Sequence, residues 1–168
     1  MFDYYSLALP YPQLEGEINQ KELLSLYDLC SGRFSKMSSI CSYLYQSIIS
    51  DEQVKELFAG IANSEMHHLS LLLNAIKHFG GNPIFAGKHN YFSGSYVNYE
   101  NDLKQVFFDN VYLKRQSVNI LTNLSANTNN GSFCNLLTRI AMDEQLHEQL
   151  LIKAYISIFS GNEEDFSE

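Results

Sequence analysis

Two Glu-x-x-His quartets occupy matching positions in the two halves of the chain. The first is Glu65-Met-His-His68 and the second is Glu144-Gln-Leu-His147. A Glu and a His three residues apart lie on the same face of a helix, near enough to bind one metal ion or two adjacent ions. One quartet arises often by chance, but two on inward helix faces form the ligand pattern of a dinuclear metal site in a helix bundle.

Apolar residues around each quartet place its Glu and His on an inward face. Positions 58, 61, 65, 68 and 72 follow the helical period, and so do positions 137, 140, 144, 147 and 151. The windows 61–72 and 140–151 share six of twelve residues, at an offset of 144 − 65 = 79 positions. This repetition indicates two related helical hairpins. The alternative for each quartet alone is a hydrogen-bonded core pair that never binds metal.

Helical periodicity predicts four segments, at about 20–49, 51–79, 100–125 and 132–159. The connections are short, long and short, with roughly twenty residues between the second and third segments. One long crossover is typical of the ferritin-like topology, so we expect an all-α, antiparallel four-helix bundle. The predicted division is an irregular segment at 1–19, the bundle at 20–160 and a tail at 161–168. We expect the irregular segment to pack across the bundle or a partner subunit.

Composition narrows the class of protein further. A chain of 168 residues with 45% hydrophobic residues suits one domain with one sizeable core. A net charge of −8 and the absence of a basic cluster argue against nucleic-acid binding. No secretory signal or membrane span is visible, and Cys30, Cys41 and Cys134 form no Cys-x-x-Cys pair. We therefore expect a cytoplasmic protein with reduced thiols and no Cys-ligated metal module.

Several motifs resemble the rubrerythrin branch of the ferritin-like superfamily, in particular its small single-domain bacterial members without a rubredoxin-type domain. Most of the chain takes part in this resemblance, which implies a di-iron or related dinuclear site. Members of the branch include peroxide reductases, ferroxidases and proteins without an assigned reaction. The motifs are Gly32, Tyr43-Leu-Tyr-Gln46, Glu65-Met-His-His68-Leu69, Gly80-Gly-Asn-Pro83, Ser93-Gly-Ser-Tyr-Val-Asn-Tyr99 and Asp143-Glu-Gln-Leu-His147.

The two remaining ligands of such a site are missing. A complete site also takes one Glu from each of the first and third helices. On the inward stripe of the first helix, the position after Gly32 is Arg33, where the family pattern has Glu. On the stripe of the third helix the corresponding position is Lys114. The neighbouring candidates are not carboxylates either: Lys36, Tyr112 and Arg115.

Arg33 and Lys114 place positive charges where a complete site would have the negative charges of two glutamates. Glu65 and Glu144 supply two negative charges, and Arg33 and Lys114 supply two positive charges, so the pocket can be near neutral without a metal ion. His68 and His147 would then be hydrogen-bonded core residues. The alternative is that each cation only packs its stem on apolar surface while its head reaches water.

The preferred hypothesis is a ferritin-like bundle with an incomplete dinuclear site and no catalytic residues. Its role would be structural or protein-binding, as a homodimer without nucleic-acid or membrane partners and with no firm cofactor. The competing hypothesis is an oxidoreductase that keeps an Fe, Mn or Zn ion on Glu65, His68, Glu144 and His147, for peroxide or ferrous-iron chemistry. Metal storage is the least favoured function, since nothing indicates assembly into a cage.

Overall fold

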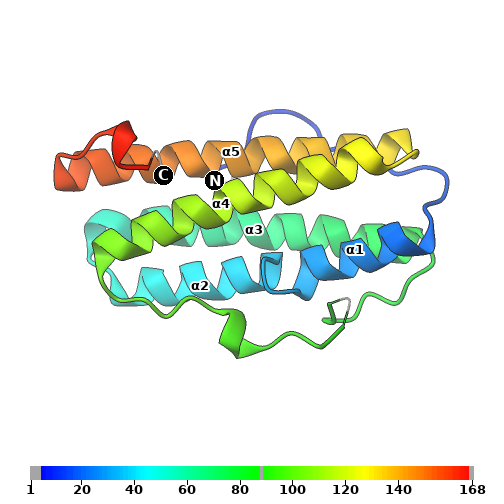
Figure 1. The fold of residues 1–168 in the computed structure, drawn as a ribbon, viewed down its shortest axis with the longest axis horizontal. Helices are drawn as coiled ribbons and strands as arrows, with labels where there is room; N and C mark the ends of the chain where they lie inside the picture. Colours follow the sequence, from blue (N-terminus) through cyan, green and yellow to red (C-terminus); the bar gives the residue numbers. More distant parts are fainter. Residues whose placement is uncertain (1–4, 88, 167–168) are drawn as a thin grey trace.

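The computed structural model describes residues 5–87 and 89–166 of the chain. Its helices form an antiparallel bundle in which α1 and α2 lie end to end along one side, as Figure 1 shows. Residues 79–102 cross over between α3 and α4, so the predicted all-α bundle with one long crossover is confirmed. The elements are α1 (Gln20–Ser31), α2 (Lys36–Ile49), α3 (Glu52–His78), η1 (Gly94–Tyr96), α4 (Leu103–Asn127), α5 (Gly131–Phe159) and η2 (Glu163–Phe166).

The segment predicted as one helix over 20–49 is two helices with a break at residues 32–35. The backbone N–H of Gly32 bonds to the Asp28 carbonyl at 2.9 Å, and a Cβ on Gly32 would lie 2.7 Å from that oxygen. Ser35 then caps α2, since its hydroxyl accepts from the backbone N–H of Ser38. The break therefore resets which side chains face inward, beginning at Lys36.

The N-terminal segment crosses the bundle and contacts both α3 and α5. The Tyr5 hydroxyl bonds to the Glu56 carbonyl of α3, and Arg139 of α5 donates to the carbonyls of Leu7 and Leu9. The expectation that the segment before Gln20 packs across the bundle therefore holds for its described residues. Residues 1–4 of the predicted N-terminal segment and 167–168 of the predicted tail lie outside the described residues.

Two apolar clusters make the core, one towards each end of the bundle. One cluster contains Leu72 of α3, Leu121 of α4 and Leu137 of α5. The other contains Phe58 of α3 and Phe107 of α4. Along α3, α4 and α5, the inward positions between these clusters are polar, so a buried polar layer separates the two apolar regions. Within the described chain, every helix is too short or too polar to cross a lipid bilayer.

Candidate functional site

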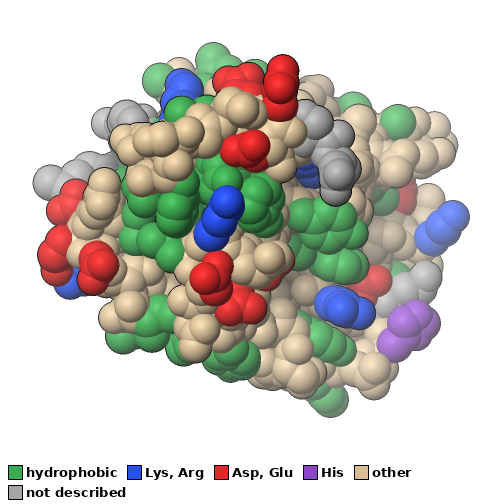
Figure 2. All heavy atoms as spheres, turned by 60° about the vertical axis from the view of Figure 1, so that its left-hand side comes forward, with side chains coloured by type: hydrophobic (Ala, Val, Ile, Leu, Met, Phe, Trp, Pro, Cys, Tyr) green, Lys and Arg blue, Asp and Glu red, His purple; other side chains and the backbone are tan. Residues whose placement is uncertain are grey.

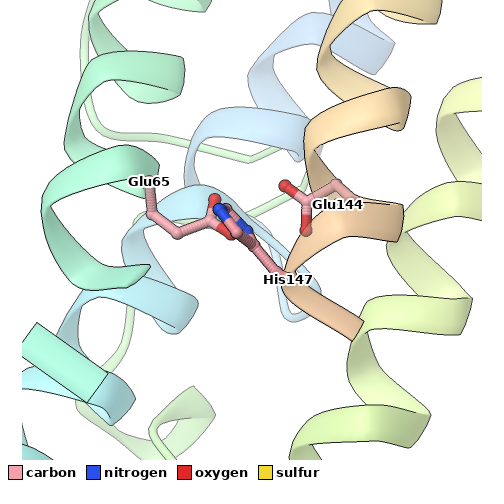
Figure 3. A group of neighbouring side chains, drawn as sticks. All are labelled: Glu65, Glu144 and His147. Carbon is pink, nitrogen blue, oxygen red and sulfur yellow. The ribbon is translucent and has the colours of Figure 1, made fainter. Parts of the chain in front are cut away.

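The bundle brings the two quartets together in the buried polar layer. Glu65 and His68 come from α3, Glu144 and His147 come from α5, and all four are fully buried. Figure 3 shows Glu65, Glu144 and His147 pointing into the same space between the two helices. One ligand atom from each of these three residues lies within 4.8 Å of the others. The inward placement that the periodicity predicted thus brings donor atoms close enough to interact.

Two lysine ammonium groups occupy the space between the carboxylates. Lys114 of α4 donates to one oxygen of Glu65 and, at 2.8 Å, to Oε2 of Glu144. Lys36 of α2 donates to Oε1 of Glu144 and lies 2.9 Å from Oε2 of Glu65. The exposed fractions of the Lys36 and Lys114 side chains are only 4% and 2%, so water does not screen these pairs. Each of the four carboxylate oxygens therefore faces an ammonium group.

The prediction that Arg33 supplies one of these charges is wrong. Arg33 is exposed, and its guanidinium carbon lies 5.6 Å from the centre of the Phe34 ring. Position 33 would face inward only if one helix continued through Gly32, whereas the break at residues 32–35 shifts the inward register to Lys36. Lys114 does face inward, so its alternative placement with its head in water does not hold.

The ion pairs set the charge state of the cluster. Burial would raise the pKa of Glu65, but the ammonium groups of Lys114 and Lys36 outweigh it and hold that pKa well below its usual value. The pKa of Glu144 is likewise lowered, with burial and the charge of Glu65 opposed by the same two lysines. Burial would lower the pKa of Lys114, yet Glu144 and Glu65 raise it. The carboxylates and the Lys114 ammonium are thus all ionised at neutral pH.

The two histidines differ in their partners and in their protonation. Burial would lower the pKa of His68, but hydrogen bonds to Asp143, Glu144 and Glu65 raise it to about 9, so this imidazole carries a positive charge at neutral pH. Burial lowers the pKa of His147, which is therefore neutral. Its Nε2 lies 2.7 Å from the Tyr5 carbonyl and must donate to it. Nδ1 of His147 then carries the lone pair and faces the cluster, 3.5 Å from Glu65.

Asp143 is a buried site residue that sequence reasoning did not single out. Its carboxylate bonds to Nε2 of His68 at 3.0 Å and accepts from the Tyr11 hydroxyl at 2.5 Å. It also accepts from the Leu7 backbone N–H at 2.8 Å and lies 2.7 Å from Arg139. Burial would raise the pKa of Asp143, but these partners lower it. The only signal in the sequence is its place beside Glu144, because its partners lie far away along the chain.

The residues present do not fit a dinuclear metal centre. Such a centre takes one bridging or terminal Glu from each of four helices, whereas α2 and α4 contribute Lys36 and Lys114. Both ammonium groups lie where they repel cations, and they engage all the oxygens of Glu65 and Glu144. Of the two histidines, His147 is neutral and keeps a lone pair on Nδ1, whereas the protonated His68 has none to offer a metal ion.

Comparison with solved structures defines the class of fold. KatB, a manganese catalase from Anabaena PCC7120, superposes with a TM-score of 0.82 over 90% of this chain and 79% of its own, at 20% identity. The Mycobacterium tuberculosis bacterioferritin BfrA has a TM-score of 0.70, over 90% of this chain and 94% of its own, at 19% identity. A dodecameric thioferritin, the bacterioferritin-related protein of Bacteroides fragilis, has a TM-score of 0.68 over 91% and 95%, at 19% identity. The fold is that of the ferritin-like four-helix bundles.

A family assignment follows from the sequence itself. The model of the rubrerythrin family matches residues 38–155, which is well over half of the chain and includes both quartets. The chain belongs to the rubrerythrin family, as the resemblance of its motifs predicted. A comparison with the sequences of curated proteins found no significant match.

Proposed function

We propose that this protein is a rubrerythrin-family bundle in which a lysine–glutamate cluster has replaced the dinuclear metal site. Its role is then structural or protein-binding rather than catalytic. The observation that carries the proposal is that Lys36 and Lys114 together face every oxygen of Glu65 and Glu144. Lys36 makes the ion pairs that were expected of Arg33. Two lysines thus balance the charges of the two glutamates.

Charge balance supports this proposal. The two ammonium groups supply the positive charge that buried carboxylates need, so the cluster costs less to bury than unpaired Glu65 and Glu144 would. A divalent ion entering the cluster would displace the ammonium groups from their partners and leave buried cations without compensation. The cluster is therefore more stable without a bound metal ion than with one.

The proposal is tested by the metal content and activity of protein purified without chelators. We expect iron, manganese and zinc well below one equivalent per chain, and peroxide consumption and ferrous-iron oxidation at the rates of the buffer. One or more equivalents of a redox metal, together with turnover that a chelator abolishes, would refute it.

A second candidate function is oxidoreductase chemistry on a single Fe or Mn ion. The close approach of donor atoms from Glu65, Glu144 and His147 favours it, as does the lone pair on Nδ1 of His147. His68 would complete the shell of the four remaining family ligands after losing the proton that it holds at neutral pH, while Asp143 holds its Nε2. This function requires both lysines to turn away from the carboxylates. Titration with Mn²⁺ or Fe²⁺ under anaerobic conditions distinguishes it, since it predicts saturable binding of one ion.

We also propose that two copies of the chain associate through α2. The outer face of this helix is apolar, with Leu44, Ile48 and Ile49 exposed by 53%, 73% and 46%, and its only charged residue, Lys36, is buried. A chain of net charge −8 can approach a second copy most easily over such an uncharged face. Figure 2 shows the end of the bundle with the α2–α3 connection, where hydrophobic side chains form patches between groups of acidic ones.

A further inference from the structure

A small cavity lies between α2 and α4, next to the buried ion pairs. Its volume is about 30 Å³, which is enough for one water molecule or one small ion. It begins at the break between α1 and α2 and reaches Lys114. The lining residues are Arg33, Phe34, Ser38, Ser39, Ser42, Tyr43, Tyr96, Asn110, Leu113, Lys114 and Ser117.

Tyr43 brings an unpartnered polar group to this cavity. Its side chain is 2% exposed, and its hydroxyl makes no hydrogen bond within the described part of the structure. Leaving a buried hydroxyl unpaired costs about 1–3 kcal/mol, so such a group usually has a partner. Burial raises the pKa of Tyr43, which keeps its proton and can donate it in a hydrogen bond. The Lys114 ammonium lies nearby, 5.1 Å from the centre of the Tyr43 ring.

The chemistry of the lining favours an acceptor with negative charge. The walls carry two cations, four serine hydroxyls, two tyrosine hydroxyls and one amide, and none of the lining residues is a carboxylate. The charges of Lys36 and Lys114 already balance those of Glu65 and Glu144, so Arg33 adds a positive charge that no ion pair among the described residues offsets. Ser38, Ser42 and Asn110 already donate to acceptors of the protein, which leaves the Tyr43 hydroxyl as a buried donor without a partner in the described part of the chain. This donor and the positive charge of Arg33 together stabilise a small anion more than they stabilise water.

The entrance to the cavity lies at the same break. A larger cleft of about 800 Å³ lies between α1 and α4, and its walls include Arg33 and Phe34, which also line the small cavity. The cleft and the cavity thus meet at Arg33 and Phe34, and the exposed guanidinium of Arg33 offsets part of the negative charge that Glu22 and Asp28 bring to the cleft.

We propose that the cavity binds one small monovalent anion of about the size of chloride, held by the Tyr43 hydroxyl and the Lys114 ammonium. Arg33 attracts it at the entrance. This inference rests on the proposed function, because Lys114 must stay in the cluster with Glu65 and Glu144. Metal content tests that function, whereas bromide binding tests this site. An ion in this place would give Tyr43 its missing partner and would fix the side chains where α2 meets α4.

The test uses bromide as the probe. Crystals of the full chain soaked in sodium bromide are expected to show an anomalous peak in the cavity, within hydrogen-bond distance of the Tyr43 hydroxyl. In solution, thermal shifts with bromide against gluconate at constant ionic strength give the affinity. Because a hydrogen bond to a charged group contributes about 1.5–3 kcal/mol, Tyr43→Phe should weaken binding by about 10- to 100-fold.

Three further variants keep the proposal falsifiable. Ser117→Val replaces a lining hydroxyl by methyl groups and should abolish the peak, while Arg33→Gln should weaken binding without changing the fold. Lys153→Gln, on the exposed face of α5, removes an equal charge elsewhere and should leave the affinity unchanged. A cavity occupied only by water, bromide bound only at other sites, or equal affinities of wild type and Tyr43→Phe would each overturn the proposal.

Discussion

The Lys36 ammonium lies 2.9 Å from Oε2 of Glu65, joining the first turn of α2 to the middle of α3. Lys114 of α4 contacts the other oxygen of Glu65 and also reaches Glu144 of α5. Four helices thus meet through two lysines and two glutamates, at the level where other bundles of this kind hold metal. Each lysine pairs with both glutamates, so removing either lysine would leave buried negative charge without full compensation.

Replacing Lys36 by Met should strongly destabilise the protein. The change removes one of the two cations and leaves the buried carboxylates of Glu65 and Glu144 partly unpaired, which costs about 3–5 kcal/mol in comparable buried pairs. Urea denaturation followed by circular dichroism measures this loss. Arg33→Met is the matched control, three residues away and exposed, and should change stability by less than about 0.5 kcal/mol. Equal effects of the two substitutions would contradict the assignment of Lys36 to the cluster.

Arg33 is exposed whereas Lys36 is buried, and this difference could not be predicted from the helical periodicity of the sequence. The bundle, its crossover and the inward faces of both quartets follow from periodicity, which persists over long helices. The inward stripe of the third predicted segment passes through Lys114, and the structure places this lysine between Glu65 and Glu144. The prediction that Arg33 faces inward is wrong because helical periodicity places side chains only within one continuous helix. Gly32 and the capping residue Ser35 were local signs of the break, and they shift the register by three positions.

Stability should fall between about pH 6.5 and 9 because of His68. Its pKa is about 9 in the folded protein, against 6.5 for an ordinary histidine, so the folded state holds this proton more tightly. The contribution is fully present below pH 6.5 and is lost as the pH rises through 9, and its size is on the order of 3 kcal/mol. The measurement is the free energy of unfolding by urea at several pH values.

In the acid range, stability should instead fall as the pH is lowered. The pKa values of Glu65, Glu144 and Asp143 are lowered by folding, so their contributions are present above the ordinary carboxyl range and are lost as the pH falls through it. The lowered pKa of His147 also reduces stability below pH 6.5. Stability should therefore be greatest near pH 6.5. A His68→Gln variant should lose the decline between pH 6.5 and 9, and persistence of that decline would show that another group causes it.

Removing the hydroxyl of Tyr11 should loosen the N-terminal segment. Tyr11→Phe deletes the 2.5 Å hydrogen bond to Asp143 and should cost about 1–3 kcal/mol, since the acceptor is charged. Hydrogen exchange of the Leu7 amide, which also bonds to Asp143, should speed up. Tyr112→Phe, at a site exposed by 56%, is the control and should have little effect. Unchanged protection of Leu7 would contradict a direct link through Asp143.

Asp143 shows what the sequence could not supply. Its partners Leu7 and Tyr11 belong to an irregular segment, and such a segment has no periodicity from which its contacts could be inferred. The family motif contains Asp143 beside Glu144, but only the course of the N-terminal segment across α3 and α5 reveals its role. The same segment supplies the Tyr5 carbonyl that fixes the tautomer of His147.

Association through α2 should be sensitive to a single charge. Ile48 is exposed by 73%, so Ile48→Glu should not disturb the folded chain but should oppose a two-fold contact that brings this position near its copy. Light scattering coupled to size exclusion should then find a dimer for wild type and a monomer for the variant. Lys153→Glu adds charge on α5 and is the control, expected to remain dimeric. A monomeric wild type, or a variant as dimeric as wild type, would exclude this interface.

Metal binding by wild type and by a Lys36→Glu, Lys114→Glu double variant tests the central claim most directly. The double variant restores a carboxylate on each of α2 and α4, so the four-glutamate, two-histidine shell of a dinuclear site becomes complete. Titration with Mn²⁺, followed by metal analysis after gel filtration, should find about two ions per chain in the variant and none retained by wild type. The control is Arg33→Glu with Lys153→Glu, which adds equal charge outside the cluster and should retain none. Stoichiometric retention by wild type would contradict the claim that lysine has replaced the metal site.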